Sequence, residues 1–482
     1  MSKYETRLFI DGEFVNSISG KTFKTINPAT EEVICEVQEA LPEDVDRAVI
    51  AANKAFERGS PWREMDGTKR RDLLLKLADL MEQNKEELAV LESLNNGKPV
   101  SSSHGDLSLA IQHFRYFAGW ADKIEGKTLP VEGNFFAYTW HEPIGPVGQI
   151  IPWNFPVLML AWKLCPALAA GCTVVLKSSE KTPLSALYCA GLIQQAGFPK
   201  GVVNIVSGFG DPTGKAIASH MDLMKIAFTG SSMTGRLIQK YAAESNMKNV
   251  SLELGGKSPL IILEDADLEQ ALGLAQLGLF LNQGQTCCAS SRIFVQESIY
   301  DKFVELATQQ SKARVLGDPN NPATMQGPQV DKIQFDRVMG YIEKGKKEGA
   351  RLTTGGERFG DKGYFIQPTV FADVQDNMVI AKEEIFGPVM SLMKFKTVEE
   401  VIDRANNTSF GLAAGVCTKN VQVGLKIARA LRAGTVWFNC FNNFDAAVPF
   451  GGYKESGIGR EKGPYALENY LEVKSVMIPF DP

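Results

Sequence analysis

Hydrophobic and polar positions divide the chain into stretches of different periodicity. The first 40 residues read as short apolar arms around turn signals at 11–12 and 27–28, which predicts two hairpins. From Pro42 to Gly97, apolar residues recur every three or four positions, which predicts three helices. Pro42 suits the first turn of the first helix, and Gly97 suits the C-cap of the last.

From Val147 onward, short apolar runs alternate with helical stretches. The first unit has predicted strands at 147–151, 173–177, 202–206, 225–228 and 250–254, with helices at 158–170, 183–196, 211–219 and 232–245. The second has strands at 259–263 and 292–296, helices at 267–281 and 298–314, and further strands and helices from 389 to 439. Repeated strand–helix–strand units predict parallel sheets with helices on both faces. Gly255-Gly256 marks the boundary between the two units.

Three apolar segments need separate interpretation. The runs NFFAYTWHE (134–142) and YLEVKSVMI (470–478) are strand patterns outside both units. Isolated strands with apolar faces need partners, so we expect arms that pair within or between subunits. The apolar run from Phe155 to Leu176 contains Lys163 and two prolines, which favours a buried helix leading into a strand over a membrane span.

Composition narrows the class of protein. A chain of 482 residues is long enough for two or three domains. Its net charge of -5 argues against nucleic-acid or anionic-membrane partners, which need an excess of Lys and Arg. Eight cysteines without a CxxC motif indicate neither a disulfide scaffold nor a metal site. No signal or transit pattern is visible at the N-terminus, so we expect a cytoplasmic protein, with a processed precursor as the alternative.

The segment LNQGQTCCAS (281–290) places Cys287 and Cys288 side by side as candidate nucleophiles. None of the four histidines has the context of a base for a Cys–His hydrolase. Glu253, in the strand pattern VSLELGG, is a better candidate because a carboxylate in a short apolar strand is costly without a function or a partner. The alternative is a glutamate that faces solvent on an alternating strand.

Two glycine-rich turns between strands and helices are candidate phosphate sites. They are SGFGDPTG, with Gly210 and Gly214, and FTGSSMTG, with Gly230 and Gly235. Backbone N–H groups at such helix starts bind phosphate, although ordinary helix caps have the same pattern. In LKSSEKTP, Glu180 is placed to accept both hydroxyls of an adenosine ribose, and a capping glutamate beside a surface lysine is the alternative.

Together these motifs identify the chain as similar to the aldehyde dehydrogenase superfamily, close to its cytosolic, mitochondrial and retinal tetrameric members. The resemblance runs nearly end to end through IPWNFP, FTGS, LELGGKSP, NQGQTC, EEIFGPV and PFGGYKESGIGRE. It implies an α/β fold with two doubly wound parallel-sheet domains and a small β oligomerisation arm. The implied ranges are 1–124 and 144–255 for an NAD-binding domain, 125–143 and 468–482 for the arm, and 256–467 for a catalytic domain.

The resemblance also implies roles in catalysis. Cys287 matches the nucleophile and Cys288 its replaceable neighbour. Glu253 matches the general base and Asn154 the oxyanion-hole amide. Lys163 and Glu461 match a proton exit route behind the base.

The cofactor and substrate positions follow from the same resemblance. Positions that would hold NAD are Ile150, Ile151, Trp153, Asn154, Lys177, Glu180, Gly210, Gly214, Phe228, Gly230, Ser231, Gly235, Leu254, Gly255, Gln334, Glu384 and Phe386. The substrate tunnel would be formed by Leu109, Phe155, Trp162, Leu281, Phe444 and Phe450. These apolar residues suit an aliphatic, aromatic or retinal-like aldehyde. No metal is expected, and a homotetramer is implied, with a dimer as the alternative.

Two departures from the family pattern concern the cofactor loops. Ser178-Ser179 stands where the family usually has Pro-Ala, and FTGSSMTG lacks a usual acidic residue. They leave open a weakly active, crystallin-like structural relative. A CoA-acylating enzyme is the other alternative, and the hydrolytic base Glu253 argues against it.

Overall fold

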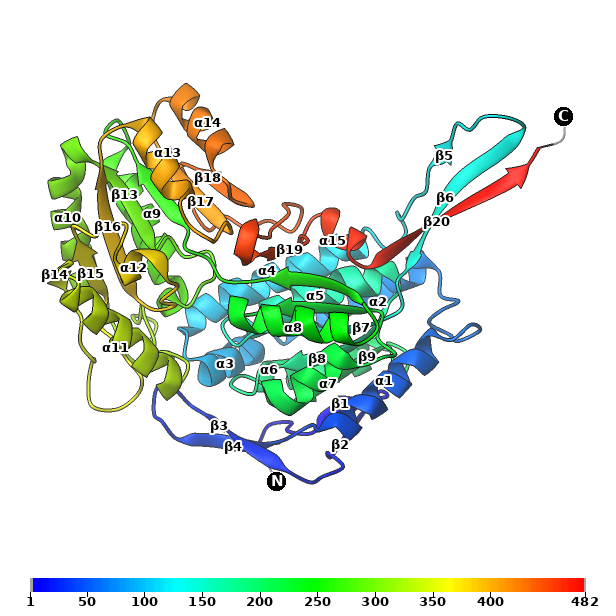
Figure 1. Cartoon of the computed structure of the whole chain (residues 1–482). Coiled ribbons are helices and arrows are strands. Elements are labelled where there is room, and N and C mark those ends of the chain that lie inside the picture. The colour runs from blue at the N-terminus through cyan, green and yellow to red at the C-terminus, as the bar shows by residue number, and fades with distance from the viewer. Residues whose placement is uncertain (1–2, 481–482) are drawn as a thin grey trace.

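Two sheets form the centres of two lobes, and a three-stranded arm projects from the first lobe (Figure 1). The structure is a computed structural model that describes residues 3–480. The predicted architecture of two parallel-rich sheets and a small arm is confirmed. The predicted arm includes residues 481–482, and the predicted first domain includes residues 1–2. All four residues lie outside the described residues.

The first sheet has a parallel centre and antiparallel edges. In spatial order its strands are β19 (Gly457–Ile458), β11 (Asn249–Glu253), β10 (Lys225–Thr229), β7 (Pro146–Ile150), β8 (Thr173–Ser178), β9 (Val203–Ser207), β1 (Leu8–Ile10) and β2 (Glu13–Val15). The chain runs outward from β7 through β8 to β9, then returns to the other side of β7 as β10. Ligands bind at such a reversal, beyond the carboxyl ends of the strands.

The second sheet is parallel except at one edge. In spatial order its strands are β14 (Arg351–Thr354), β15 (Thr369–Ala372), β16 (Val389–Phe395), β13 (Arg292–Gln296), β12 (Pro259–Ile262), β17 (Ala413–Cys417) and β18 (Thr435–Phe438). Only β14 is antiparallel to its neighbour. The two-residue strand β19 follows the strands of the second sheet in the chain but pairs with β11 of the first sheet. This pairing connects the two lobes.

Helices cover both sheets. Those of the first lobe are α1 (Pro42–Phe56), α2 (Gly67–Gln83), α3 (Lys85–Asn96), α4 (Val100–Ala118), α5 (Pro156–Ala170), α6 (Leu184–Ala196), the π-helical turn η1 (Gly210–Gly214), α7 (Lys215–Ser219) and α8 (Ser232–Glu244). Later in the chain follow α9 (Leu268–Phe280), the 3-10 helix η2 (Leu281–Gly284), α10 (Glu297–Lys312), α11 (Lys332–Lys347), α12 (Val379–Lys382), α13 (Val398–Asn406), α14 (Val421–Ala430), the 3-10 helix η3 (Lys454–Ser456) and α15 (Tyr465–Glu468).

Several elements differ from the sequence-based prediction. Helices α4 and α11 and strands β14 and β15 were not predicted. Three successive serines in the first turn of α4 obscure its start, because serine competes for backbone hydrogen bonds. The predicted buried helix after Phe155 is confirmed, since every residue of α5 is buried. Within residues 3–480, no helix has both the length and the apolar composition needed to cross a membrane.

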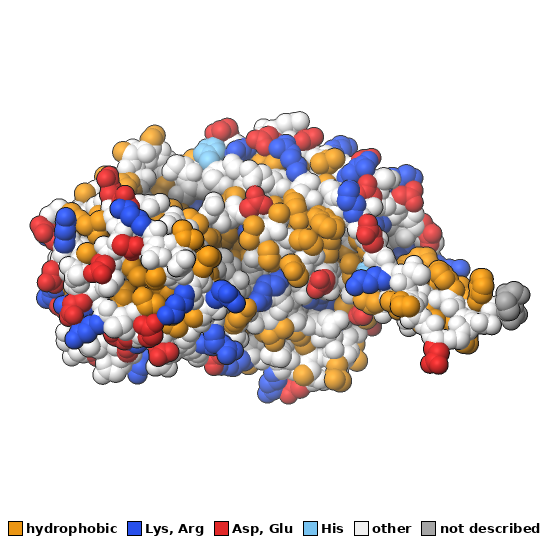
Figure 2. All heavy atoms as spheres, turned by 90° about the horizontal axis from the view of Figure 1, so that it is seen from above, with side chains coloured by type: hydrophobic (Ala, Val, Ile, Leu, Met, Phe, Trp, Pro, Cys, Tyr) orange, Lys and Arg blue, Asp and Glu red, His pale blue; other side chains and the backbone are white. Residues whose placement is uncertain are grey.

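The two strands without an assigned sheet pair with each other in the arm. β6 (Phe135–Pro143) and β20 (Leu471–Pro479) run antiparallel along their full length, and β5 (Thr128–Leu129) adds a short third strand. A separate hairpin of β3 (Thr22–Ile26) and β4 (Val33–Gln38) lies near the N-terminus (Figure 1). Apolar side chains are exposed along the projecting arm (Figure 2), including Phe136, Trp140 and Val473.

Gly457 is required at the strand that joins the lobes. Its φ is 142°, and an added Cβ would overlap the carbonyl oxygen of Leu252 in β11. We predict that Gly457→Ala lowers the free energy of unfolding by about 2 kcal/mol, because backbone strain and the lost pairing act together. Urea unfolding followed by tryptophan fluorescence measures this change.

The matched control is Gly340→Ala in α11, where an added Cβ meets nothing within 4 Å. Alanine is the better helix former, so this variant should be at least as stable as the parent. Equal losses of stability in the two variants would contradict a specific role for Gly457.

Candidate active site

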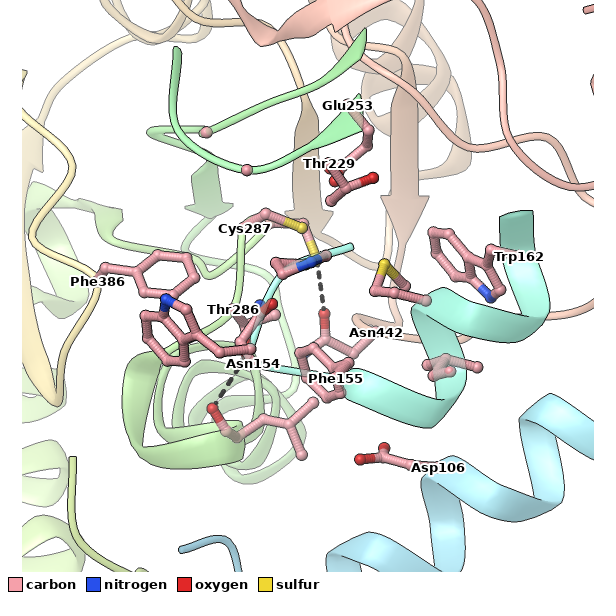
Figure 3. Close-up of a pocket in the computed structure, with 18 of the residues that line it drawn as sticks. Asp106, Asn154, Phe155, Trp162, Thr229, Glu253, Thr286, Cys287, Phe386 and Asn442 are labelled. Carbon is pink, nitrogen blue, oxygen red and sulfur yellow. Dashed lines mark hydrogen bonds between the residues drawn. The ribbon is translucent and has the colours of Figure 1, made fainter. Parts of the chain in front are cut away.

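A cavity of about 630 Å³ lies where the carboxyl end of the first sheet faces the second lobe (Figure 3). Residues that follow β7, β10 and β11 line one part of it, and residues from α4, α5, η2 and the loop after β18 line another. In Figure 3, Cys287 lies between Phe386 and Trp162, with Glu253 beyond its side chain. The structure therefore brings together groups that are far apart in the sequence.

The loop that carries Cys287 has an unusual backbone. Asn282 and Gln283 have φ values of 51° and 58°, and Gly284 follows with 74°. Non-glycine residues rarely adopt this conformation, and such strain concentrates at functional sites. An added Cβ at Gly284 would overlap the carbonyl of Gly387, so the loop depends on this glycine.

Cys287 and Cys288 both line the cavity but differ in surroundings. Cys288 is 1% exposed, and its thiol donates to Oδ1 of Asn442 at 3.5 Å. The side-chain hydrogen bond with Cys288, burial and the charge of Glu253 raise the pKa of the Cys287 thiol well above its usual range. Cys287 is therefore a protonated thiol in this structure, and becoming a thiolate requires a base or a new positive charge nearby.

Glu253 is the last residue of β11 and is 2% exposed. Burial raises the pKa of its carboxyl to about 8, and the charge of Lys163 and a hydrogen bond with Cys287 oppose that rise. Oε1 has no hydrogen-bond partner among the described residues. A buried carboxyl with one oxygen free beside a thiol has a pKa close to neutral pH, as a general base needs.

Hydrogen bonds hold both the side-chain amide and the backbone carbonyl of Asn154. Its side-chain Nδ2 donates to the carbonyl oxygen of Gln285 at 2.9 Å. Its own carbonyl oxygen accepts from Nζ of Lys98 at 2.9 Å and from Nδ2 of Asn282 at 2.8 Å. Asn96 adds a longer contact of 3.4 Å to the same oxygen. The second N–H of the Asn154 amide is therefore positioned beside the nucleophile loop.

Lys163 and Glu461 form an ion pair behind Glu253. The ammonium of Lys163 is fully buried, and Glu461 is 6% exposed. Neither residue lines the cavity, but both charges act on Glu253: Lys163 lowers its pKa and Glu461 raises it. The two ionisable groups thus lie close enough to Glu253 to change its pKa, and their role as a proton exit route stays a prediction.

On one side of Cys287, the cavity is shaped to hold an extended polar ligand. Thr229, Gly230 and Ser231 line it at the start of α8. An added Cβ at Gly230 would meet the ring of Phe228 at 2.5 Å, and one at Gly235 would meet Leu254 at 2.7 Å. Both glycines are thus required by the packing of Phe228 and Leu254. The free N–H groups at the start of a helix of this length suit a phosphate.

Aromatic and acidic side chains also line this side of the cavity. The rings of Trp153 and Phe386 meet edge to face at 5.3 Å. Oε1 of Glu384 accepts from the backbone N–H of Gly256 at 3.1 Å, and burial raises the pKa of this carboxyl to about 7. Nε2 of Gln334 donates to the carbonyl oxygen of Phe386 at 2.7 Å, so it fixes the loop that carries the ring.

A third group of predicted cofactor residues lies outside the cavity. Nζ of Lys177 is 3.7 Å from Oε2 of Glu180 at the end of β8. Gly214 packs beside them, since an added Cβ would be 3.7 Å from the Lys177 side chain. The predicted cofactor positions that do not line the cavity are Ile150, Ile151, Lys177, Glu180, Gly210, Gly214, Phe228, Gly235 and Leu254.

On the other side of Cys287, the cavity wall is apolar. The six predicted tunnel residues, Leu109, Phe155, Trp162, Leu281, Phe444 and Phe450, all line the cavity. The rings of Trp162, Phe444 and Phe450 form a cluster with centroid distances of 5.4 to 6.1 Å. Such a wall buries an apolar chain without satisfying a charge.

Sequence reasoning missed several lining residues. Met159 lies one helical turn from Phe155 on α5, so its spacing could have revealed it. Asp106 and Gly105 lie on α4, which was not predicted. Asn442 has a φ of 55° in a loop without a motif, and no signal in the sequence pointed to it.

Comparison with known proteins agrees with this geometry. The model of the aldehyde dehydrogenase family matches residues 14–476. Human mitochondrial aldehyde dehydrogenase is 59% identical over 98% of this chain and 92% of its own length, and human aldehyde dehydrogenase 1A1 is 57% identical over 98% and 95%. The NAD+ complex of the Bacillus cereus aldehyde dehydrogenase is similar with a TM-score of 0.98 and 55% identity, covering 100% of this chain and 98% of that one. The chain belongs to the aldehyde dehydrogenase family.

Proposed function

We propose that this protein oxidises apolar aldehydes to carboxylic acids with NAD, through a covalent bond to Cys287. The expectations of an aldehyde dehydrogenase and of NAD as its cofactor are confirmed by the family match and by a neighbour that is an NAD+ complex. The observation that carries the mechanism is the convergence of Cys287, Glu253 and Asn154 on one cavity.

In this proposal the Cys287 thiol loses its proton to water, and the thiolate attacks the aldehyde carbonyl and forms a thiohemiacetal. Negative charge develops on the former carbonyl oxygen. The free N–H of the Asn154 amide and the backbone N–H of Cys287 stabilise that charge, and each such donor typically contributes about 3–4 kcal/mol. The contacts of Lys98 and Asn282 fix the backbone of Asn154, and the bond of its Nδ2 to the carbonyl oxygen of Gln285 orients the side-chain amide before the substrate arrives.

Glu253 then acts on the thioester that oxidation leaves on Cys287. Its carboxylate takes a proton from water, and the hydroxide equivalent releases the acid. Because burial raises the pKa of Glu253 to about 8, the base is mostly protonated at pH 7 and becomes active as the pH rises. Lys163 and Glu461 carry the proton away from the cavity.

The residues present fit a dinucleotide. Gly230 and Ser231 line the cavity at the start of α8, where backbone N–H groups would hold the pyrophosphate, and Glu180 beside Lys177 would hold the adenosine ribose. Trp153, Glu384 and Phe386 surround the part of the cavity nearest Cys287. When bound there, NAD supplies the hydride acceptor. The chain's own residues hold it and exclude water, and Glu180 would repel the extra phosphate of NADP.

The domain division is part of the proposal. Residues 1–124 and 144–255 would bind NAD, 256–467 would supply Cys287, and 125–143 with 468–482 would form the arm. The pairing of β19 with β11 is the point at which the second segment enters the first sheet. Exposed apolar side chains on β6 and β20 support pairing of the arm with another copy, as a tetramer or a dimer. Cytoplasmic location is likewise a proposal, since a human relative is named as mitochondrial.

The two alternatives make different predictions about products and binding. A CoA-acylating enzyme would form an acyl-CoA and would need no general base, whereas a buried Glu253 is present. A crystallin-like relative would not release heat on titration with millimolar NAD. The free acid as product, together with saturable NAD binding, separates the proposal from both.

Substitutions at the two cysteines and at Glu253 test the assignment. Cys287→Ser should lower kcat at least about 1,000-fold, because a serine hydroxyl has no base strong enough to activate it here. Cys288→Ser should retain activity within about fivefold. Glu253→Gln should release about one NADH per site and then stall, since the thioester forms but is not hydrolysed. Stopped-flow absorbance at 340 nm measures all three, and full turnover in Cys287→Ser would show that the nucleophile is elsewhere.

The pH dependence of turnover gives a second test. A base acts in its deprotonated form, so deacylation should rise with pH and level off above about pH 8, the pKa of Glu253. Where deacylation limits kcat, the pH profile of kcat follows this titration. A profile that falls between pH 6 and 8 would contradict Glu253 as the base.

Alkylation of Cys287 tests the interaction between the two groups. The Glu253 charge raises the pKa of the thiol, so Glu253→Gln should shift the rate of iodoacetamide labelling to lower pH. Mass spectrometry of the peptide that carries Cys287 measures labelling, and Cys287→Ser gives the background. A shift to higher pH in Glu253→Gln would mean that the carboxylate activates the resting thiol instead.

A further inference from the structure

Lys462 is a buried lysine on the outer side of the substrate cavity. Its residue is 3% exposed, and it does not line the cavity. Its ammonium lies 5.1 Å from the ring centroid of Trp162 and 4.8 Å from that of Phe444. Both rings line the cavity, so the charge lies directly against the aromatic wall that a substrate contacts.

This ammonium has no conventional partner. Within residues 3–480, no carboxylate lies within 4 Å of it, and it donates no hydrogen bond. Asp445 is the carboxylate that acts on it most, and Asp445 is exposed to solvent. Burial lowers the pKa of Lys462 to about 8, so the charged form still prevails at pH 7. Two aromatic faces lie against this charge and attract it, and the exposed carboxylate of Asp445 adds a Coulomb attraction.

The other charges on this side of the cavity do not compensate for Lys462. Asp106 lines the cavity, but its carboxylate pairs with Nζ of Lys98 at 2.6 Å. His113 packs against Trp162, and burial lowers its pKa to about 3, so it is neutral. Glu253 is mostly protonated at pH 7 because its pKa is about 8. Among the described residues, the carboxyls that line the substrate side, Asp106 and Glu253, are thus paired or protonated, and the exposed Asp445 does not line the cavity.

A cluster of Trp162, Phe444 and Phe450 would otherwise suit a quaternary ammonium group, since aromatic rings attract cations through their faces. Here a cation of the protein already polarises two of these rings. We propose that Lys462 is a specificity-determining residue that excludes aldehydes carrying a positive charge and leaves the cavity to neutral or anionic ones. This inference rests on the proposed aldehyde oxidation, but its physical basis is the charge distribution of the cavity wall.

Two aldehydes of the same shape test the proposal. 3,3-Dimethylbutanal and (trimethylammonio)acetaldehyde differ by one positive charge at the same position. Their intrinsic reactivities differ, so the decisive quantity is the change in the ratio of their kcat/KM values between variants. Lys462→Met removes the charge and keeps the length of the side chain. It should shift this ratio at least about fivefold in favour of the cationic aldehyde.

The charge-retaining control is Lys462→Arg, which should leave the ratio close to that of the parent. A shift of the same size in both variants would overturn the proposal, because repacking and not charge would then explain it. An unchanged ratio in Lys462→Met would overturn it as well. Lys462→Gln serves as a second neutral variant if Lys462→Met does not fold.

Binding of alcohols separates this inference from the proposed function. 3,3-Dimethylbutan-1-ol and choline are a matched neutral and cationic pair that need no catalysis. Calorimetric titration should show that Lys462→Met or Lys462→Gln gains affinity for choline relative to the neutral alcohol. This gain without oxidation of either aldehyde would support the role of Lys462 and contradict the proposed activity. Active protein without this gain would overturn the role of Lys462 alone.

Discussion

The close approach of two segments of the second lobe to Gly255 and Gly256 is the constraint on which the site depends. An added Cβ at Gly255 would overlap the carboxylate of Glu384, and one at Gly256 would meet the carbonyl oxygen of Cys287 at 2.6 Å. Because Gly255 and Gly256 have no side chains, the nucleophile loop and the Glu384 loop can both reach the end of β11. Glu253 lies two residues before Gly255, so the same approach places it beside Cys287.

This close packing also determines the protonation states. Closing the space around β11 removes water from Glu253 and Cys287 and raises the pKa of both groups. The buried pair of Lys163 and Glu461 lies near enough to act on Glu253 in opposite directions. The resting site therefore contains a neutral acid and a neutral thiol, each near a group that can change its charge. The protonation of Glu253 therefore changes with pH near neutrality.

The two sides of the cavity divide recognition between polar and apolar contacts. Toward α8, free backbone N–H groups, glycines and the carboxyl of Glu384 suit a dinucleotide. Toward α5, aromatic rings form the wall, and the charge of Lys462 lies behind them. Under the proposed function, these rings and this charge would select among aldehydes by electrostatics as well as by shape.

The sequence alone determined most strands and helices of both sheets, although not β14 and β15, together with the family and the residues expected at the site. Periodicity and local motifs are properties of neighbouring residues, which is why they can be read from the sequence. It did not reveal α11, or α4 with its three serines in the first turn, nor Asn442 and Asp106 at the cavity. Only the tertiary structure decided which motifs meet, that β6 pairs with β20, and that Glu253 is buried with Oε1 left without a hydrogen-bond partner. The burial of Glu253, which determines its pKa, and the position of Lys462 depend on contacts between segments hundreds of residues apart. No local sequence pattern encodes such contacts.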